Sequence, residues 1–486
     1  MALALAFMCI GANAITLPWQ HGRLQVSDNH RYLQHQDGTP FFWLGETGWL
    51  LPQRLDRNEV SYYLGTCASL GYNVVQVQTL NGVPAFNIYG EPSHRKPDLY
   101  DFSCFAGAPD NSYWGHMDYI VEQAQLRGIY IGMVCIWGGL VKAGLMNEEQ
   151  AVKYGAFLAE RYKGYPNIIW IIGGDQRGDV KPEVWETLAR TIRSIDPDHL
   201  MTYHPRGRTC SSTWWNEKEW LDLNMFQSGH RRYGQRNGDG DYTIAEDTEE
   251  DSWRYIQNYY LSLGLTENGE NAGNLHGTLK PILDGEPSYE RIPQGLHDVH
   301  APQWQAHDVR RYAYWSVFGG ACGHTYGNNA LMQFYRPGVN GAYGCNTPWW
   351  EALNDPGFRQ MQHLKRLILA FPYLERRPDQ RVLVGAYGEK YHRPCACRGE
   401  DYILVYTYTG EPLQLDLTRI AGDKKHAWWY DPTTGSLIDG GEFDNHLCQK
   451  FKVPKQAHRS ADASRDMVLI VTDAAASYVE TNLLAP

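Results

Sequence analysis

The stretch of sequence that decides the fold reads Asn167-Ile168-Ile169-Trp170-Ile171-Ile172-Gly173-Gly174-Asp175. Its apolar, largely β-branched run predicts a strand, and two glycines and one acid follow that strand directly. A second stretch has the same order of strand, glycine and acid: Pro281-Ile282-Leu283-Asp284-Gly285-Glu286-Pro287. The glycines allow close approach of backbone or ligand, and each acid stands just beyond the end of its strand.

Strand-like and helix-like segments alternate around these two stretches, from residue 41 to about residue 334. The other expected strands are 41–45, 72–78, 129–136, 200–203, 223–226 and 321–325, and the expected helices are 59–70, 117–124, 147–163, 184–195, 252–263 and 307–317. This alternation predicts an α/β fold, a (β/α)8 TIM barrel. An open doubly wound sheet is the alternative, but the sequence lacks the glycine-rich phosphate loop that normally follows an early strand there.

The pattern of the sequence changes after residue 378. Short strand patterns at 381–387, 401–408 and 467–472 are separated by Gly, Pro and Asp turns, and 428–435 is a strand running into a turn. We therefore expect a catalytic barrel with N-terminal strands at 15–375 and a small all-β sandwich at 376–486. A helix at 361–371 joins the two, and the Gly- and Asn-rich segment 266–278 is interpreted as a surface insertion.

Composition limits the classes of partner. The formal net charge is −11 with acids and bases interspersed, so the chain lacks the basic footprint of a nucleic-acid-binding protein. An acidic polysaccharide would be repelled on average, and binding one would need locally placed arginines. The 17 Trp, 32 Tyr and 14 Phe residues can stack on sugars or fill large cores.

The first 14 residues, MALALAFMCIGANA, predict a signal peptide that ends in the small-x-small pattern Ala12-Asn13-Ala14. The run lacks the usual positive start and is too short to span a bilayer. We therefore expect export to the periplasm or the extracellular space. No metal site or cofactor is expected, because the sequence has no C-x-x-C pair or cofactor motif. Cys395 and Cys397 could form disulfides with other cysteines in an exported chain.

The carboxylates after strands four and seven are the candidate catalytic residues. Glycoside hydrolysis usually needs a protonated acid for the leaving oxygen and a second carboxylate as nucleophile or base. Asp175 and Glu286 end strands that lie on opposite sides of a barrel mouth, so they can face each other across a sugar. The alternatives are a surface Asp in a loop and a structural Glu paired with an arginine. Glu46, after strand one, is a third carboxylate at this edge.

Other polar and aromatic residues at or near strand ends are candidates for binding the substrate. Histidines there could bind sugar hydroxyls or hold the carboxylates, although a lone histidine is as often a structural partner. Tryptophans could stack on a sugar or pack the barrel. The expected substrate-binding set is Glu46, Trp49, Gln78, Trp137, His204, Arg206, Gln227, His230, Tyr289 and His324.

Several long motifs in order resemble the apiosidase-like enzymes of glycoside hydrolase family 140. They are Phe42-Trp43-Leu44-Gly45-Glu46-Thr47-x-Trp49, Gly173-Gly174-Asp175, His204-Pro205-Arg206-Gly207 with Ser211-Ser212-x-Trp214, Asn224-Met225-x-Gln227-Ser228-Gly229-His230, Asp284-Gly285-Glu286-Pro287-x-Tyr289-Glu290 and Gly323-His324-Thr325-Tyr326-Gly327. Near the end, Tyr430-Asp431-Pro432-x-x-Gly435 resembles a domain of that family that is named for collagen binding. The resemblance covers about residues 20–475.

The resemblance implies an enzyme that removes terminal apiose from pectic rhamnogalacturonan-II side chains. It implies that Asp175 is the acid/base and Glu286 the nucleophile, which agrees with the strand-end interpretation. We expect a retaining reaction in which Glu286 is ionised and raises the pKa of a protonated Asp175. Another exo-furanosidase, such as an arabinofuranosidase, is the alternative enzyme. A non-catalytic carbohydrate- or matrix-binding protein is the alternative of another class.

Overall fold

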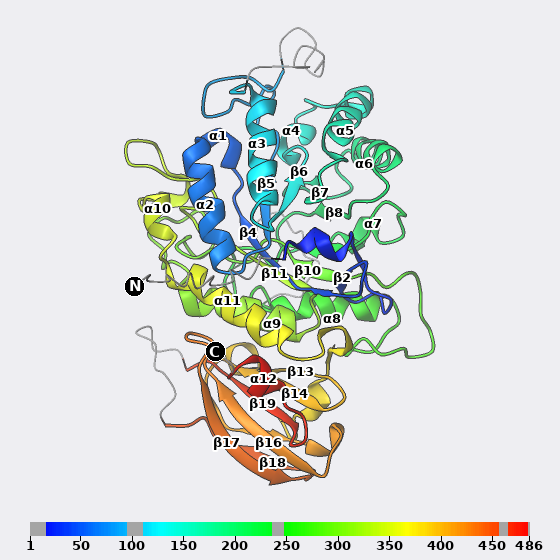
Figure 1. The fold of residues 1–486 in the computed structure, drawn as a ribbon, viewed down its shortest axis with the longest axis vertical. Coiled ribbons are helices and arrows are strands. Elements are labelled where there is room, and N and C mark those ends of the chain that lie inside the picture. The colour runs from blue at the N-terminus through cyan, green and yellow to red at the C-terminus, as the bar shows by residue number, and fades with distance from the viewer. Residues whose placement is uncertain (1–15, 95–109, 236–246, 456–464, 485–486) are drawn as a thin grey trace, which may run out of the picture.

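The computed structural model describes residues 16–94, 110–235, 247–455 and 465–484, so the predicted signal peptide at 1–14 lies outside the described residues. Eight parallel strands form a nearly closed barrel in the order β8-β7-β6-β5-β4-β11-β10-β9, which confirms the predicted fold (Figure 1). These strands are β4 (Trp43–Thr47), β5 (Val74–Gln78), β6 (Tyr130–Val134), β7 (Ile168–Gly173), β8 (Met201–His204), β9 (Asn224–Phe226), β10 (Ile282–Asp284) and β11 (Gly323–Tyr326). Each lies within a few residues of its predicted position.

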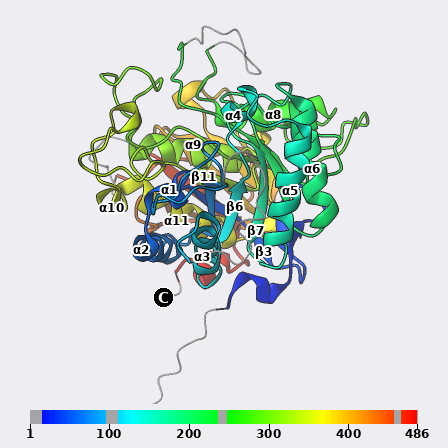
Figure 2. The same ribbon diagram turned by 90° about the horizontal axis from the view of Figure 1, so that it is seen from above.

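Helices surround the strands. They are α1 (Leu51–Arg54), α2 (Arg57–Ser69), α3 (Tyr113–Gln125), α4 (Gly138–Lys142), α5 (Glu148–Tyr162), α6 (Pro182–Ile195), α7 (Ser212–Trp215), α8 (Ser252–Ser262), α9 (Ala306–Phe318), α10 (Trp349–Ala352) and α11 (Pro356–Leu369). Helices α5 and α6 lie side by side next to β7 (Figure 2). The Asn147 side chain accepts a hydrogen bond from the backbone N–H of Gln150 and starts α5, as the sequence predicts. None of the helices in the described ranges has the length and hydrophobicity that a membrane crossing needs.

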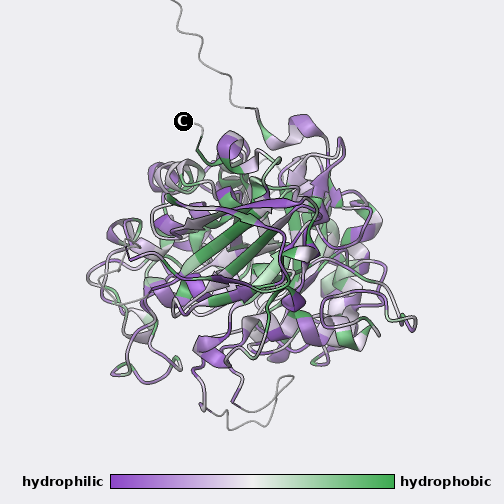
Figure 3. Ribbon diagram, turned by 90° about the horizontal axis from the view of Figure 1, so that it is seen from below, coloured by the Kyte–Doolittle hydropathy of each residue, from purple (hydrophilic) through white to green (hydrophobic). Residues whose placement is uncertain are grey.

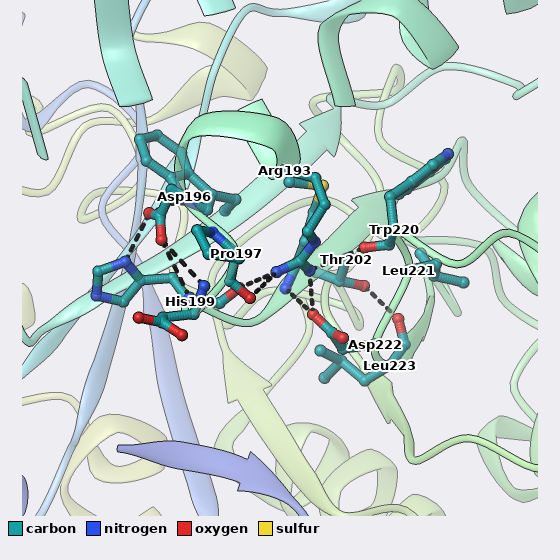
Figure 4. A network of polar contacts seen from close by, with 12 residues as sticks. Arg193, Asp196, Pro197, His199, Thr202, Trp220, Leu221, Asp222 and Leu223 are labelled. Atoms are coloured by element: carbon teal, nitrogen blue, oxygen red, sulfur yellow. Dashed lines mark hydrogen bonds and ion pairs between the residues drawn. The ribbon is translucent and has the colours of Figure 1, made fainter. Parts of the chain in front are cut away.

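Side chains join β8 to β9, where the ordered ladder of the barrel ends (Figure 4). The backbone N–H of Asp222 donates to the carbonyl of Met201 at 2.9 Å, and the Asp222 carboxylate accepts the N–H of Met201 at 2.7 Å. The Thr202 hydroxyl donates to the carbonyl of Leu223 at 2.8 Å. Arg193 of α6 binds the same carboxylate and the carbonyl oxygens of neighbouring loops. The barrel is therefore closed at this seam largely by side chains.

Two smaller sheets complete the chain. A three-stranded antiparallel sheet, β1 (Leu24–Val26), β2 (Leu33–His35) and β3 (Pro40–Phe41), precedes the barrel. The C-terminal part pairs a six-stranded sheet with the two-stranded β15-β18 sheet around its own apolar core. Its strands are β12 (Arg377–Pro378), β13 (Cys395–Arg398), β14 (Tyr402–Thr407), β15 (Leu413–Leu415), β16 (Lys424–Tyr430), β17 (Leu437–Asp444), β18 (Gln449–Phe451) and β19 (Met467–Asp473), followed by α12 (Tyr478–Asn482). Seen from that side, the central strands are hydrophobic and many of the surrounding segments are hydrophilic (Figure 3).

The interface between barrel and sandwich is centred on α9, which lies between the barrel strands and the second part in Figure 1. Two arginines of α9, Arg310 and Arg311, are almost fully buried there. Arg310 binds Asp466 through two hydrogen bonds of 2.9 Å. Arg311 pairs with Glu250 and Asp308, and its guanidinium group lies against aromatic rings from both parts of the chain. One buried ion pair, Arg310–Asp466, and the ring contacts of Arg311 therefore hold the sandwich on the barrel.

Two local expectations differ from the structure, and a third is confirmed. The predicted strand at 381–387 is wrong: residues Gln380–Val382 form a 3-10 turn, because the Asp379 carboxylate accepts the N–H of Arg381 and pairs with its side chain. The insertion at 266–278 is largely exposed, but it packs toward the sandwich, where Glu270 pairs with Arg381. Cys395 and Cys397 are buried on β13 as free thiols and form no disulfide.

Candidate active site

Asp175 occupies a tight turn at the end of β7. Its backbone is left-handed, with φ of 52°, and the preceding Gly173 and Gly174 have φ of 87° and 127°. A Cβ atom at Gly173 would lie 2.6 Å from the carbonyl oxygen of His204, and one at Gly174 would lie 3.1 Å from the backbone nitrogen of Gly138. Both glycines are therefore needed for the turn that places the acid beyond the strand.

Glu286 lies just beyond β10, and only 7% of its surface is exposed. The loop around it is fixed from two directions. Gln76 of β5 reaches across the barrel and donates to the carbonyl of Gly285 at 2.8 Å. Asp284 accepts the hydroxyl of Ser228 at 2.6 Å. These contacts hold the Glu286 backbone where β9, β10 and the barrel interior meet.

Two histidines contact Glu286. The Nε2 atom of His230 lies 3.2 Å from Oε1, and the Nε2 atom of His204 lies 3.1 Å from Oε2. His204 also accepts the backbone N–H of Asp175 on its Nδ1 atom, at 3.1 Å. Since an accepting ring nitrogen carries no proton, the proton of a neutral His204 is on Nε2, the atom that lies 3.1 Å from Glu286 Oε2. One histidine therefore connects the two carboxylate loops.

The two carboxylates have opposite pKa shifts. Burial is the largest effect on Asp175, and together with the negative charge of Glu286 it raises the pKa of Asp175 to about 6. Burial also acts to raise the pKa of Glu286, but the contacts with His204 and His230 outweigh it and lower that pKa to about 2. In mildly acidic solution one acid is protonated while the other is ionised. A proton donor beside a nucleophile or base is the arrangement that glycoside hydrolysis uses.

A pocket of about 580 Å³ opens over the two carboxylates. One wall is aromatic: the Trp49 and Trp137 rings lie 5.6 Å apart, and Trp49 donates its indole N–H to the Tyr289 hydroxyl at 3.0 Å. Nine of the predicted site residues line this pocket, namely Asp175, Glu286, Trp49, Gln78, Trp137, Arg206, Gln227, His230 and Tyr289. The structure therefore brings most of the predicted set together at one place.

Three predicted substrate-binding residues do not line the pocket. His204 is completely buried beneath it, where it contacts both carboxylate loops. Glu46 accepts a hydrogen bond from Tyr63 of α2, and His324 lies 3.4 Å from the hydroxyl of Ser316 of α9, so both side chains point into the helix layer. Burial raises the pKa of Glu46 well above its usual value and lowers that of His324 to about 3. His324 is therefore uncharged near neutral pH, and burial favours the protonated form of Glu46.

The sequence interpretation missed one side of the pocket. Two of the missed residues, Arg208 and Arg231, stand next to predicted residues in the sequence. The segment after β11 follows no strand or helix period and gave no signal, yet its Asn340 and Tyr343 line the pocket. Leu296, His297 and Arg54 also line the pocket.

The family described as "Apiosidase-like, catalytic domain" matches residues 27–375. The chain belongs to the apiosidase-like family. A second family, described as "Putative collagen-binding domain of a collagenase", matches residues 377–472. No curated protein matches the chain.

Solved structures agree with this membership. The apiosidase-like chain is 57% identical to a glycoside hydrolase family 5 protein from Bacteroides vulgatus ATCC 8482, with a TM-score of 0.89 and 96% of each chain covered. A protein described as a glycoside hydrolase is 56% identical, with a TM-score of 0.89, and the match covers 96% of this chain and 100% of that one. The apiosidase-like chain is therefore a glycosidase, and each of these two matches covers 96% of it.

Proposed function

We propose that this glycosidase is an exported, exo-acting apiosidase that releases apiose from pectic rhamnogalacturonan-II side chains. The observation that carries the chemistry is geometric: Asp175 and Glu286 line one pocket, and His204 contacts the backbone of the first and lies 3.1 Å from the carboxylate of the second. The choice of sugar rests on membership of the apiosidase-like family. Export rests on the small-x-small sequence at the start of the chain.

The two carboxylates act in two steps in this proposal. Asp175 gives its proton to the glycosidic oxygen as the bond from that oxygen to the anomeric carbon breaks, and a Glu286 oxygen forms a bond to the same carbon. Water then attacks the anomeric carbon and gives a proton to Asp175, and Glu286 leaves as a carboxylate. His204 and His230 keep Glu286 ionised and oriented at the start of each cycle.

The charge around the pocket favours an acidic substrate. Arg54, Arg206, Arg208 and Arg231 line it, although the whole chain has a net charge of −11. Pectic chains carry uronic acid carboxylates, and guanidinium groups bind carboxylates well. The pocket's volume of about 580 Å³ suits a terminal sugar with part of its neighbour, which favours attack at the end of a chain.

The test is digestion of rhamnogalacturonan-II oligosaccharides and identification of the released monosaccharide. We expect apiose from the wild type and none from a Glu286→Gln control of equal thermal stability. Release of arabinose from terminal arabinofuranosides, with apiose untouched, would instead support the alternative furanosidase. Following the configuration of the first-formed sugar by NMR tests retention.

A further inference from the structure

Tyr343 lines the pocket from the segment between β11 and α10. It belongs to a short 3-10 turn, Ala342–Gly344, far along the chain from the strand-end motifs. The position of this turn is fixed by side-chain amides. Gln333 accepts the N–H of Ala342 at 2.7 Å and donates to its carbonyl at 3.2 Å. Asn329 donates to the carbonyl of Tyr343 itself at 3.2 Å.

The backbone of Tyr343 is left-handed, with φ of 53°. This conformation is uncommon for a residue with a large side chain and costs roughly 1–3 kcal/mol. Such residues are concentrated at ligand-binding and catalytic sites, where the surrounding contacts hold them in place. The amide contacts of Asn329 and Gln333 supply that support here. The strained turn directs an aromatic residue to the pocket rather than to solvent.

The phenol group of Tyr343 can donate a hydrogen bond within the pocket. Burial, followed by the charges of Glu286 and Asp175, raises the pKa of Tyr343, so the phenol keeps its proton. Tyr343, Asp175 and Glu286 line the same pocket. Among the residues that the structure describes, none forms a hydrogen bond with the Tyr343 hydroxyl.

We propose that Tyr343 is a substrate-binding residue, and that its hydroxyl donates a hydrogen bond to a hydroxyl group of the sugar bound between Asp175 and Glu286. Its ring packs against the apolar cluster of Tyr289, Ile292, Trp304 and Tyr312. The inference rests on the glycosidase activity of the chain, whereas the choice of test sugar rests on the proposed apiosidase function. A residue that serves only to pack the loop would need the ring but not the hydroxyl.

The first experiment compares Tyr343→Phe with the wild type on 4-nitrophenyl β-D-apiofuranoside. Removing one partner of a buried hydrogen bond costs about 1–3 kcal/mol, so kcat/KM should fall by roughly 5-fold to 150-fold. Tyr335→Phe is the matched control, because Tyr335 precedes the same turn but does not line the pocket. The melting temperatures of both variants should match the wild type.

The second experiment identifies the sugar hydroxyl. Removing the correct hydroxyl from the substrate should lower kcat/KM for the wild type and should lower it no further for Tyr343→Phe, because both changes remove the same hydrogen bond. For substrates that lack a different hydroxyl, the fold-loss in kcat/KM from Tyr343→Phe and the fold-loss from the missing hydroxyl should multiply. A Tyr343→Phe enzyme with wild-type kcat/KM, or losses that multiply for every deoxygenated substrate, would overturn the proposal.

The design separates this proposal from the proposed sugar. A wild type that cleaves 4-nitrophenyl α-L-arabinofuranoside and leaves the apiofuranoside intact contradicts the apiosidase function alone, and the Tyr343 comparison is then made on the arabinofuranoside. An equal kcat/KM of wild type and Tyr343→Phe on the cleaved glycoside contradicts only the role of Tyr343.

Discussion

The barrel mouth and the interface between barrel and sandwich both bury charged side chains, but they arrange them in opposite ways. At the interface each charge has an opposite partner: Arg310 binds Asp466 with two hydrogen bonds, and Arg311 binds Glu250 and Asp308. At the mouth two acids are brought together, and histidines rather than arginines contact one of them. At the interface, full pairing of opposite charges holds two parts of the chain together. At the mouth, the negative charges are only partly compensated, and this keeps the two acids in different protonation states.

The difference lies in what a partner does to a carboxylate. An arginine stays positively charged at any pH of interest and keeps its partner ionised. His204 contacts the backbone N–H of Asp175 rather than its carboxylate. Burial and the neighbouring negative charge favour the protonated form of Asp175, and they outweigh the opposing effect of the histidines on its pKa. The histidines at the mouth therefore stabilise mainly the negative charge of Glu286. Because Asp175 keeps its proton to a higher pH, it can act as the acid in catalysis.

The largest expected effect is at the mouth. Asp175→Asn and Glu286→Gln should each lower kcat by about 10²–10⁴-fold, because each removes a group that transfers a proton or attacks the sugar. Circular dichroism and melting temperature should stay those of the wild type, since both substitutions keep the side-chain shape. A well-folded variant that retains more than about a tenth of the wild-type kcat would remove its residue from the catalytic pair.

A substitution at the interface should instead change the stability of the fold. Asp466→Ala leaves Arg310 buried without its main partner and should lower the free energy of unfolding by about 3–5 kcal/mol. Asp444→Ala is the control: Asp444 pairs with Lys424 on the exposed face of the same sheet, and such exposed pairs contribute little to stability. Urea denaturation measures both. If Asp466→Ala were no more costly than Asp444→Ala, the interface pair would not hold the two parts together.

The pH dependence of the enzyme follows from the mouth. The raised pKa of Asp175 means that its proton is present at low pH and is lost as the pH rises through about 6. The lowered pKa of Glu286 means that this carboxylate stays ionised down to about pH 2. We expect kcat/KM to be highest in mildly acidic solution and to fall above about pH 6. A profile that rises steadily from pH 5 to pH 8 would contradict the assignment of Asp175 as the acid.

The interaction between the two acids can be measured directly. Glu286→Gln removes the negative charge beside Asp175 and should therefore lower the pKa of Asp175. Infrared carboxyl bands or NMR can follow this titration in the wild type and the variant. Burial remains the larger cause and is unaffected by the substitution, so the pKa of Asp175 should stay above its usual value. An unchanged or higher pKa in the variant would show that Glu286 does not influence the acid.

The smallest effect is expected at Glu46, a strand-end acid that belongs to neither region. Burial favours its protonated form, and its carboxyl accepts a hydrogen bond from the Tyr63 hydroxyl. Glu46→Gln keeps the shape and the acceptor for Tyr63, so kcat should fall by less than about 10-fold, below the range expected for loss of acid catalysis. A loss as large as that of Glu286→Gln would mean that the helix-facing carboxyl takes part in the reaction.

Glu46 also shows what sequence could and could not supply. The barrel strands were predictable because each is a short apolar run, and Asp175 and Glu286 were predictable because glycines carry the chain beyond the strand before the acid. Glu46 lies inside β4, where successive side chains alternate between the barrel interior and the helices. Without the register of β4, the sequence cannot distinguish these two faces. His324 inside β11 was misjudged for the same reason.

The other differences come from long-range contacts. Segment 381–387 has a strand pattern but begins in a 3-10 turn, because the Asp379 carboxylate bonds the backbone and side chain of Arg381 there. Tyr343 could not be found because the amides that fix its turn, Asn329 and Gln333, are chosen by tertiary packing and follow no period. A hydrophobic period identifies helices and strands. The irregular segments that complete a pocket depend instead on tertiary contacts, which the period does not show.

The side-chain seam between β8 and β9 has a consequence for the motions of the barrel. The N–H of Met201 is bonded to a carboxylate and not to a neighbouring strand, and Asp222 supplies both that acceptor and a donor of its own. Protonating or replacing one side chain therefore weakens several bonds across the seam at once. Local opening should begin there, and amide hydrogen exchange should be faster at Met201 and Asp222 than in the continuous ladder of β5 and β6. His204 ends β8, so opening the seam would also loosen the link between the two catalytic loops.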